Sequence, residues 1–89
     1  MDKYSYNSEI IGEKINDNVI LIDPTSSEAF VLESTAAYVW ELFWCNKALS
    51  LNELYSEISK EFGVLTSQDK EEINTFINEL EERNILIRN

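Results

Sequence analysis

Residues 19–44 read VILIDPTSSEAFVLESTAAYVWELFW, and the hydrophobic period changes within this stretch. The apolar, largely β-branched run at 19–22 predicts a central strand. Residues 23–27 contain turn chemistry with a proline, and 28–32 predict the next strand of an antiparallel meander. After Ser34, which is placed to cap a helix, apolar residues recur at helical spacing. The stretch therefore predicts two strands that lead directly into a helix.

The flanking segments extend this pattern on both sides. Residues 8–15 predict a first strand, with Gly12 as a candidate bulge. Ser50 and Glu53 form a capping-box sequence that begins a second helix. The following segments supply a glycine stop at Gly63, a cap for a third helix at Thr66 or Ser67, and a stop for that helix at Asn84. This order predicts an α+β, winged-helix-like domain in which a three-stranded antiparallel sheet is followed by three helices.

The length allows one hydrophobic core, since the chain has 89 residues. We expect residues 8–89 to form a single domain and residues 1–7 to be a flexible N-terminal segment. The apolar residues 85–87 must pack against the core. The aromatic face of the first helix is expected to be core as well, although two tryptophans, Trp40 and Trp44, are rarely both hidden in so small a domain.

The charge of the chain limits the partners it can bind. It carries 17 acidic and 7 basic residues, for a net charge of -10. Nucleic acids and anionic membranes require clustered lysine and arginine, so both are excluded as expected partners. No stretch approaches the roughly 20 apolar residues of a membrane span, and the first residues lack the apolar run of a signal peptide. We therefore expect a cytoplasmic protein.

The groups that catalysis needs are missing from the sequence. There is no histidine, and two glycines cannot make a glycine-rich phosphate loop. The one cysteine, Cys45, has no histidine to activate it and is expected to be a small buried residue. The carboxylates between 71 and 82 lie along one helix, which is typical of a solvated face. The sequence therefore predicts neither an enzyme nor a bound metal or cofactor.

The order and spacing of these motifs resemble the PqqD-like family across residues 15–88. The matching segments are VILIDP at 19–24, AFVLE at 29–33, STAAYVWELF at 34–43, LSLNEL at 49–54, EFGV at 61–64 and NIL at 84–86. Glu33 and Asn84 stand where the family usually has asparagine and glycine, and residues 46–48 lack the usual glycine. These departures fall at turns and caps.

The resemblance implies a function in recognising ribosomally made precursor peptides. The leader of the precursor would add as a strand along residues 28–32, in a groove against the third helix. Phe30 and Leu32 match the aromatic-x-Leu pair of the family and are expected to face the core. The residues expected to bind the peptide are Glu28, Ala29, Val31, Leu32, Asp69, Ile73, Phe76, Ile77 and Leu80.

The partner enzyme stays open between two pathways. A separate recognition chain of this size occurs with the leader peptidase of lasso-peptide biosynthesis, which we favour, and with radical-SAM enzymes. Two other functions compete with leader binding, a winged-helix transcription regulator and a generic protein-binding adaptor. A regulator needs a basic recognition helix, yet residues 67–83 contain only Lys70 and Arg83 against six carboxylates.

The composition predicts that the purified protein binds no transition metal. With no histidine and one cysteine, it lacks the ligands that zinc and iron prefer. Elemental analysis of tag-free protein should give far less than one equivalent of either metal. One equivalent of zinc or iron would contradict the prediction that the protein is not an enzyme and binds no metal.

Overall fold

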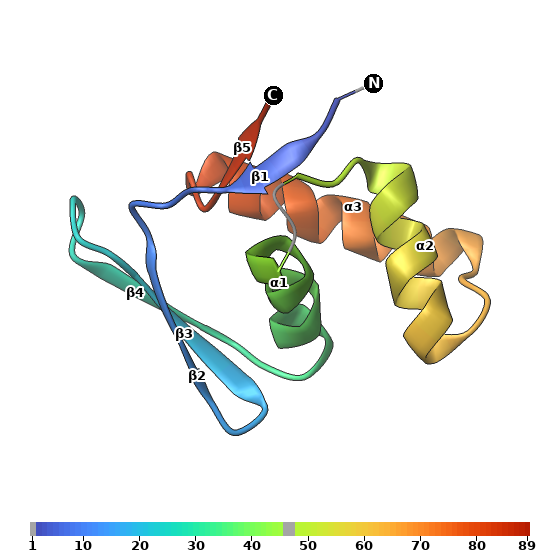
Figure 1. The fold of residues 1–89 in the computed structure, drawn as a ribbon, viewed down its shortest axis with the longest axis horizontal. Coiled ribbons are helices and arrows are strands. Elements are labelled where there is room, and N and C mark those ends of the chain that lie inside the picture. Colours follow the sequence, from blue (N-terminus) through green and yellow to red (C-terminus); the bar gives the residue numbers. More distant parts are fainter. Residues whose placement is uncertain (1, 46–47) are drawn as a thin grey trace.

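A computed structural model describes residues 2–45 and 48–89. A three-stranded antiparallel sheet in the order β2-β3-β4 is followed in sequence by three helices. The elements are β2 (Ile11–Ile15), β3 (Asn18–Asp23), β4 (Glu28–Leu32), α1 (Thr35–Cys45), α2 (Leu51–Phe62) and α3 (Ser67–Glu82). Figure 1 shows α1 between this sheet and the other two helices. The predicted α+β, winged-helix-like fold is therefore confirmed.

The N-terminal residues contribute a strand that the sequence did not predict. β1 (Tyr4–Tyr6) pairs antiparallel with β5 (Leu86–Arg88), and Figure 1 shows this small sheet beside α3. Tyr4 also exchanges two backbone hydrogen bonds with Leu49, at 2.8 and 2.9 Å. The expectation of a flexible segment over residues 1–7 is therefore wrong, because β1 lies within it.

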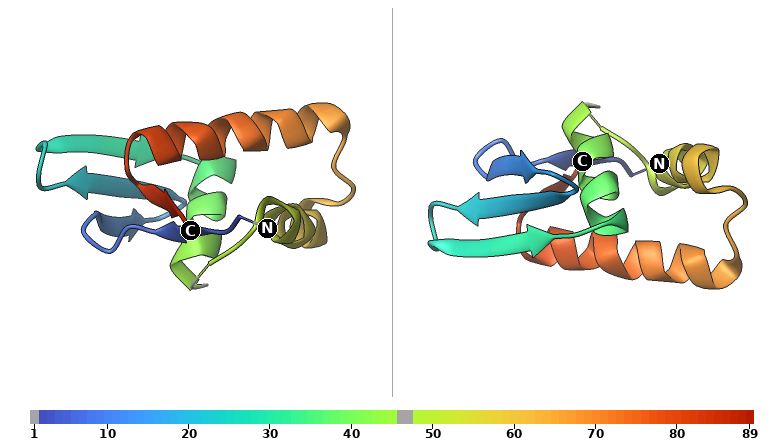
Figure 2. Two further views of the ribbon diagram at one scale, coloured as in Figure 1. Left: turned by 90° about the horizontal axis from the view of Figure 1, so that it is seen from above. Right: turned by 90° about the horizontal axis from the view of Figure 1, so that it is seen from below.

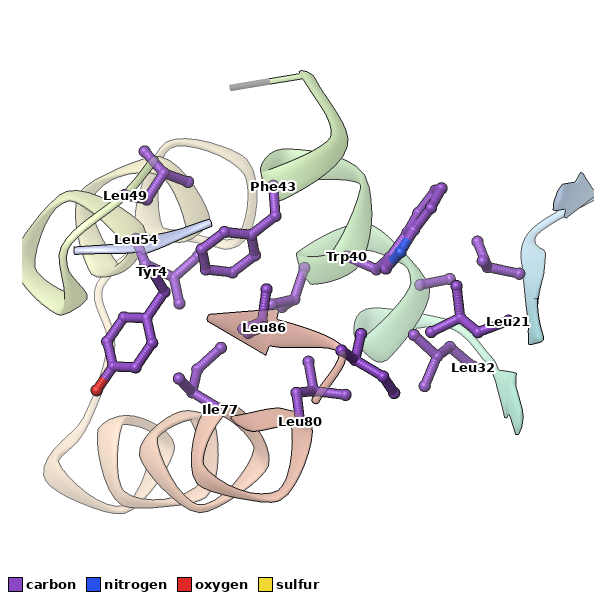
Figure 3. Close-up of a cluster of buried hydrophobic side chains, with 14 of the residues drawn as sticks. Tyr4, Leu21, Leu32, Trp40, Phe43, Leu49, Leu54, Ile77, Leu80 and Leu86 are labelled. Atoms are coloured by element: carbon purple, nitrogen blue, oxygen red, sulfur yellow. The ribbon is translucent and has the colours of Figure 1, made fainter. Parts of the chain in front are cut away.

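The helices and the small sheet share one hydrophobic core. Figure 3 shows Phe43 from α1, Leu54 from α2, Ile77 and Leu80 from α3, and Leu86 from β5 pointing toward one another. Each of these side chains is at most 3% exposed. The predicted packing of the apolar C-terminal tail is confirmed for its first two residues, which are buried.

Trp40 connects α1 to the three-stranded sheet. Its side chain is 3% exposed and lies beside Leu21 and Leu32 (Figure 3). A Cβ atom at Gly12 would stand 2.5 Å from Cζ2 of Trp40, so the indole requires a glycine at this point of β2. The bulge expected at Gly12 is wrong, because β2 pairs with β3 in continuous register from Ile11 to Ile15.

The second and third helices begin as predicted. Ser50 and Glu53 form a reciprocal capping box at α2, and Thr66 and Asp69 form another at α3. The hydrogen bond from the Ser50 amide, followed by that from Lys3, lowers the pKa of Glu53. Lys3 and Glu53 also form a salt bridge at 3.2 Å. This carboxylate therefore connects the start of α2 to the N-terminal segment.

Asn84 stops α3 as predicted. It has φ 60°, in the left-handed region that asparagine tolerates better than most residues. The amide of Ile85 returns to the carbonyl of Leu80 at 2.9 Å, as in a Schellman termination. Asn84 therefore makes the turn for which the PqqD-like pattern uses glycine. The departure at residues 46–48 falls mostly on residues 46–47, which lie outside the described residues.

The last turns of α1 and α2 extend past the core. Trp44 is 56% exposed, which confirms that one of the two tryptophans is not hidden. Cys45 is exposed, so the expectation of a buried cysteine is wrong. Phe62, the last residue of α2, is also 56% exposed, and its ring meets that of Tyr38 edge-on at 5.2 Å. Helical spacing correctly predicted that the aromatic face of α1 packs on the core, but not the residue at which the core ends.

The assignment of β1 to the core can be tested at Tyr4, whose side chain is 4% exposed. Tyr4→Ala should lower the free energy of unfolding by about 3 kcal/mol or more, because it removes a buried ring. Urea denaturation followed by circular dichroism measures this change. Ser5→Ala in the same strand is the control and should have a much smaller effect. A Tyr4→Ala variant within about 0.5 kcal/mol of wild type would contradict the packing of β1.

Candidate functional site

β4 forms one edge of the three-stranded sheet. Its register with β3 runs from Asp23↔Glu28 to Val19↔Leu32, and no strand in the described part of the chain pairs with its other side. Figure 2 shows β4 on the side of the sheet nearest α3, with β2 at the opposite edge. The structure therefore places an unpaired strand edge next to a helix.

The register also fixes which backbone groups of β4 point away from β3. A two-residue turn joins Ile15 to Asn18, and the residues that flank such a turn exchange both hydrogen bonds. Hydrogen-bonded residues alternate along a strand, so β3 bonds to β2 through its even-numbered residues and to β4 through its odd-numbered ones. Their partners on β4 are the even-numbered residues. The N–H and C=O groups of Ala29 and Val31 are therefore directed at the free edge.

Side chains alternate between the two faces of β4. Leu32 is buried and Phe30 is half-buried, and both pack on the core as predicted. Ala29 is exposed and Val31 is 58% exposed on the outer face. This face continues across the sheet as an apolar surface, which we call the outer sheet face and which comprises Ile11, Ile15, Ile20, Ile22, Ala29 and Val31.

A groove lies between β4 and the C-terminal half of α3. Its volume is about 380 Å³, and most of the residues around it are apolar. It is lined by Ala29, Phe30, Val31, Leu32, Phe76, Glu79, Leu80, Arg83 and Ile85. We call it the β4–α3 groove.

A second pocket of about 400 Å³ adjoins this groove. It lies between the start of α1, the end of α2 and the start of α3, and Phe76 lines both cavities. Its lining residues are Thr35, Ala36, Val39, Ile58, Phe62, Val64, Leu65, Asp69, Glu72, Ile73 and Phe76. The two cavities together make a site that follows one side of α3.

The residues predicted to bind a peptide fall into four places. Five line the β4–α3 groove, namely Ala29, Val31, Leu32, Phe76 and Leu80. Asp69 and Ile73 line the second pocket, and Glu28 is exposed at the start of β4. Ile77 is 0% exposed and belongs to the core, so its assignment to the groove is wrong. That the other eight bind a peptide stays a prediction.

Asp69 has a structural partner as well as a place in the pocket. Its Oδ2 atom accepts a hydrogen bond from the amide of Thr66 at 3.0 Å, and the hydroxyl of Thr66 accepts one from the amide of Asp69. The carboxylate is therefore held at the first turn of α3. A substitution at Asp69 would change the helix start together with the pocket.

Sequence reasoning missed the two charged residues of the groove, Glu79 and Arg83. Arg83 follows Leu80 by three residues and so lies on the same side of the helix end, toward β4, whereas Glu79 borders both the groove and the outward side of α3. The guanidinium carbon of Arg83 lies 4.6 Å from the centroid of the Phe30 ring. The spacing from Phe76 through Leu80 to Arg83 is a usable signal, but the count of charges over residues 67–83 shows Arg83 only as one of two basic residues.

Comparison with known proteins gives the family. The sequence matches, over residues 18–86, the family model described as coenzyme PQQ synthesis protein D, or PqqD. The chain belongs to the PqqD family. The matched residues run from the start of β3 into β5, so they include both sides of the β4–α3 groove.

Two solved structures have the same fold as this PqqD family member. One is described as TbiB1 in complex with the TbiA(beta) leader peptide, with a TM-score of 0.80, 20% identity, and coverage of 92% of this chain and 93% of that one. The other is described as lasso peptide synthetase B1 complexed with the leader peptide, with a TM-score of 0.75, 19% identity, and coverage of 94% and 96%. No curated protein matches the sequence.

Two features are absent from the residues that the structure describes, 2–45 and 48–89. None of the helices there is long and apolar enough to cross a membrane. Within the same residues, no group of three or more histidine, cysteine, aspartate or glutamate side chains could hold a metal ion.

The contrast between Ile73 and Ile77, one helical turn apart on α3, tests the placement of the site. Ile77→Asp should unfold the protein or destabilise it by several kcal/mol, because it buries a carboxylate in the core. Ile73→Asp should stay folded, because Ile73 is only partly buried at the pocket. Urea denaturation of both variants measures the difference. Equal stability of the two would contradict the assignment of Ile77 to the core.

Proposed function

We propose that this chain is a non-catalytic recognition element that binds the leader of a ribosomally synthesised precursor peptide and delivers it to a maturation enzyme. The observation that carries the proposal is the unpaired edge of β4 beside an apolar groove. An extended peptide on such an edge gains main-chain hydrogen bonds from the strand and selectivity from side-chain pockets.

The edge supplies the groups that a peptide strand needs. Ala29 and Val31 each direct one N–H and one C=O at the free side of β4, as the register requires. A peptide there would become a fourth strand of the sheet. Its side chains on the inner face would enter the β4–α3 groove and, farther along, the second pocket that begins at Phe76.

The class of ligand is supported by the structural neighbours. Two chains of the same fold are described as complexes with leader peptides, at TM-scores of 0.80 and 0.75. The competing proposal of a transcription regulator has no support of this kind. The residues on the outward side of α3 include Glu71, Glu72 and Glu79, which would repel DNA phosphates.

Delivery of the leader needs a second surface for the enzyme. The outer sheet face is continuous with β4, and Ile11, Ile22 and Val31 on it are 56%, 41% and 58% exposed. An enzyme that covers this face would contact the added peptide strand directly. We favour a lasso-peptide leader peptidase, since one neighbour is described as a lasso peptide synthetase B1, and place a radical-SAM enzyme second. We expect both steps to take place in the cytoplasm.

Val31→Pro tests the proposal at the edge itself. Proline removes the N–H that points away from β3 and so leaves the native ladder intact. The affinity of this variant for a synthetic peptide with the sequence of the cognate leader should fall at least about tenfold. Fluorescence anisotropy of a labelled leader measures the change, and Ile73→Asp should also weaken binding through the second pocket.

The matched control for Val31→Pro is Lys14→Pro. Lys14 lies on β2 at the opposite edge of the same sheet, and its N–H also points away from β3. This variant should fold and bind the leader like wild type. The proposal fails if folded Val31→Pro and Ile73→Asp both bind the leader as tightly as wild type does.

A further inference from the structure

Arg83 differs from most basic residues of this acidic chain. Four basic side chains form salt bridges with carboxylates, those of Lys3, Lys14, Lys60 and Arg88. In the described part of the chain, Arg83 has neither a salt bridge nor a side-chain hydrogen bond, although the sequence contains 17 acidic residues. Its guanidinium lies over the Phe30 ring instead. The groove therefore holds a cation whose charge no carboxylate neutralises directly.

The ring contact also positions the cation. The guanidinium carbon is 4.6 Å from the Phe30 centroid, within the distance of a favourable cation–π contact. The backbone amide of Arg83 donates to the carbonyl of Glu79 at 3.1 Å, which fixes the end of α3. Glu79 is the other charged residue of the groove, yet its carboxylate forms no salt bridge with Arg83. Arg83 is thus held against β4 with donors available for a ligand.

The sheet geometry determines which peptide residue would meet Arg83. Directly opposite residues of neighbouring strands place their side chains on the same face. The peptide residue beside Phe30 would therefore point to the inner face, toward Arg83. The residue beside Leu32, two positions away, would point to the same inner face, into a groove whose lining is mostly apolar.

We infer that Arg83 recognises an aspartate or glutamate side chain of the bound peptide, two positions from an apolar side chain that enters the groove beside Leu32. This inference rests on the proposed function and names the chemistry of its ligand. A guanidinium binds a carboxylate through two parallel N–H···O bonds, which gives the pair both strength and direction. Elsewhere the net charge of -10 disfavours acidic side chains, so one acidic position would be selective.

The inference can be tested without knowing the natural leader. A phage-displayed library of random 16-residue peptides is selected on wild-type protein, Arg83→Glu and Lys70→Glu. Lys70 is the matched control, because it also lies on α3 over an aromatic ring, that of Tyr55 at 5.7 Å, but outside the β4–α3 groove. Wild type and Lys70→Glu should enrich aspartate or glutamate two positions from an apolar residue. Arg83→Glu should enrich lysine or arginine at the same position.

Affinities of one selected peptide complete the test. Exchanging the acidic residue of this peptide for lysine should weaken its binding to wild type at least about tenfold. The Arg83→Glu variant should instead bind the lysine peptide more tightly than the acidic one. A merely structural role for Arg83 would weaken all peptides alike. If Arg83→Glu does not fold, Arg83→Gln should lose the acidic preference.

The possible failures are distinguishable. Selected peptides with no acidic preference at any position, or the same preference on Arg83→Glu, would overturn the inference. A library that yields no binders on wild type would overturn the proposed function on which the inference rests.

Discussion

The packing of Trp40 against Gly12 is the contact on which the rest of the structure depends. The sheet and the helices meet through side chains on one face of β2, β3 and β4, and the indole fills the space at β2 where a Cβ atom would stand at 2.5 Å. This contact keeps the sheet against α1, whose other side packs on α2 and α3. The position of β4 relative to α3, and hence the groove between them, follows from it. A larger residue at Gly12 would shift the edge strand together with the core.

The sequence was sufficient for elements with strong local signals. The change from apolar strand runs to helical periodicity at Ser34 located the end of the sheet. The capping-box sequence at Ser50 and Glu53 located the start of α2, and the cap expected at Thr66 or Ser67 located that of α3. β1 was missed because three residues, Tyr4–Tyr6, carry no periodicity of their own. Their strand exists because β5 pairs with them from the other end of the chain, and local patterns contain no information on such a contact. The apolar character of residues 85–87 predicted that this tail packs against another element but did not identify that element as β1.

The candidate site was predictable in outline and not in detail. The resemblance to the PqqD-like pattern, through its aromatic-x-Leu pair, separated Phe30 and Leu32 from Ala29 and Val31, as the structure has them. The apolar stripe of α3 includes residues that pack in the core and residues that line the pocket. Periodicity alone therefore cannot separate Ile77, which is fully buried, from Ile73, which is only partly buried. Charged groove residues such as Arg83 are hidden from a search for apolar stripes. In the structure, Arg83 lines the groove and its guanidinium lies over the Phe30 ring.

The central claim, that a peptide pairs with the free edge of β4, is tested most directly by amide hydrogen exchange. Nuclear magnetic resonance of the ¹⁵N-labelled protein, with and without saturating leader peptide, resolves the exchange rate of single amides. The amides of Ala29 and Val31 should exchange at least about tenfold more slowly in the complex, because they become hydrogen-bonded to the added strand. Those of Gly12 and Lys14, at the opposite edge, should not change. Unchanged exchange at Ala29 and Val31 in a saturated complex would contradict the claim.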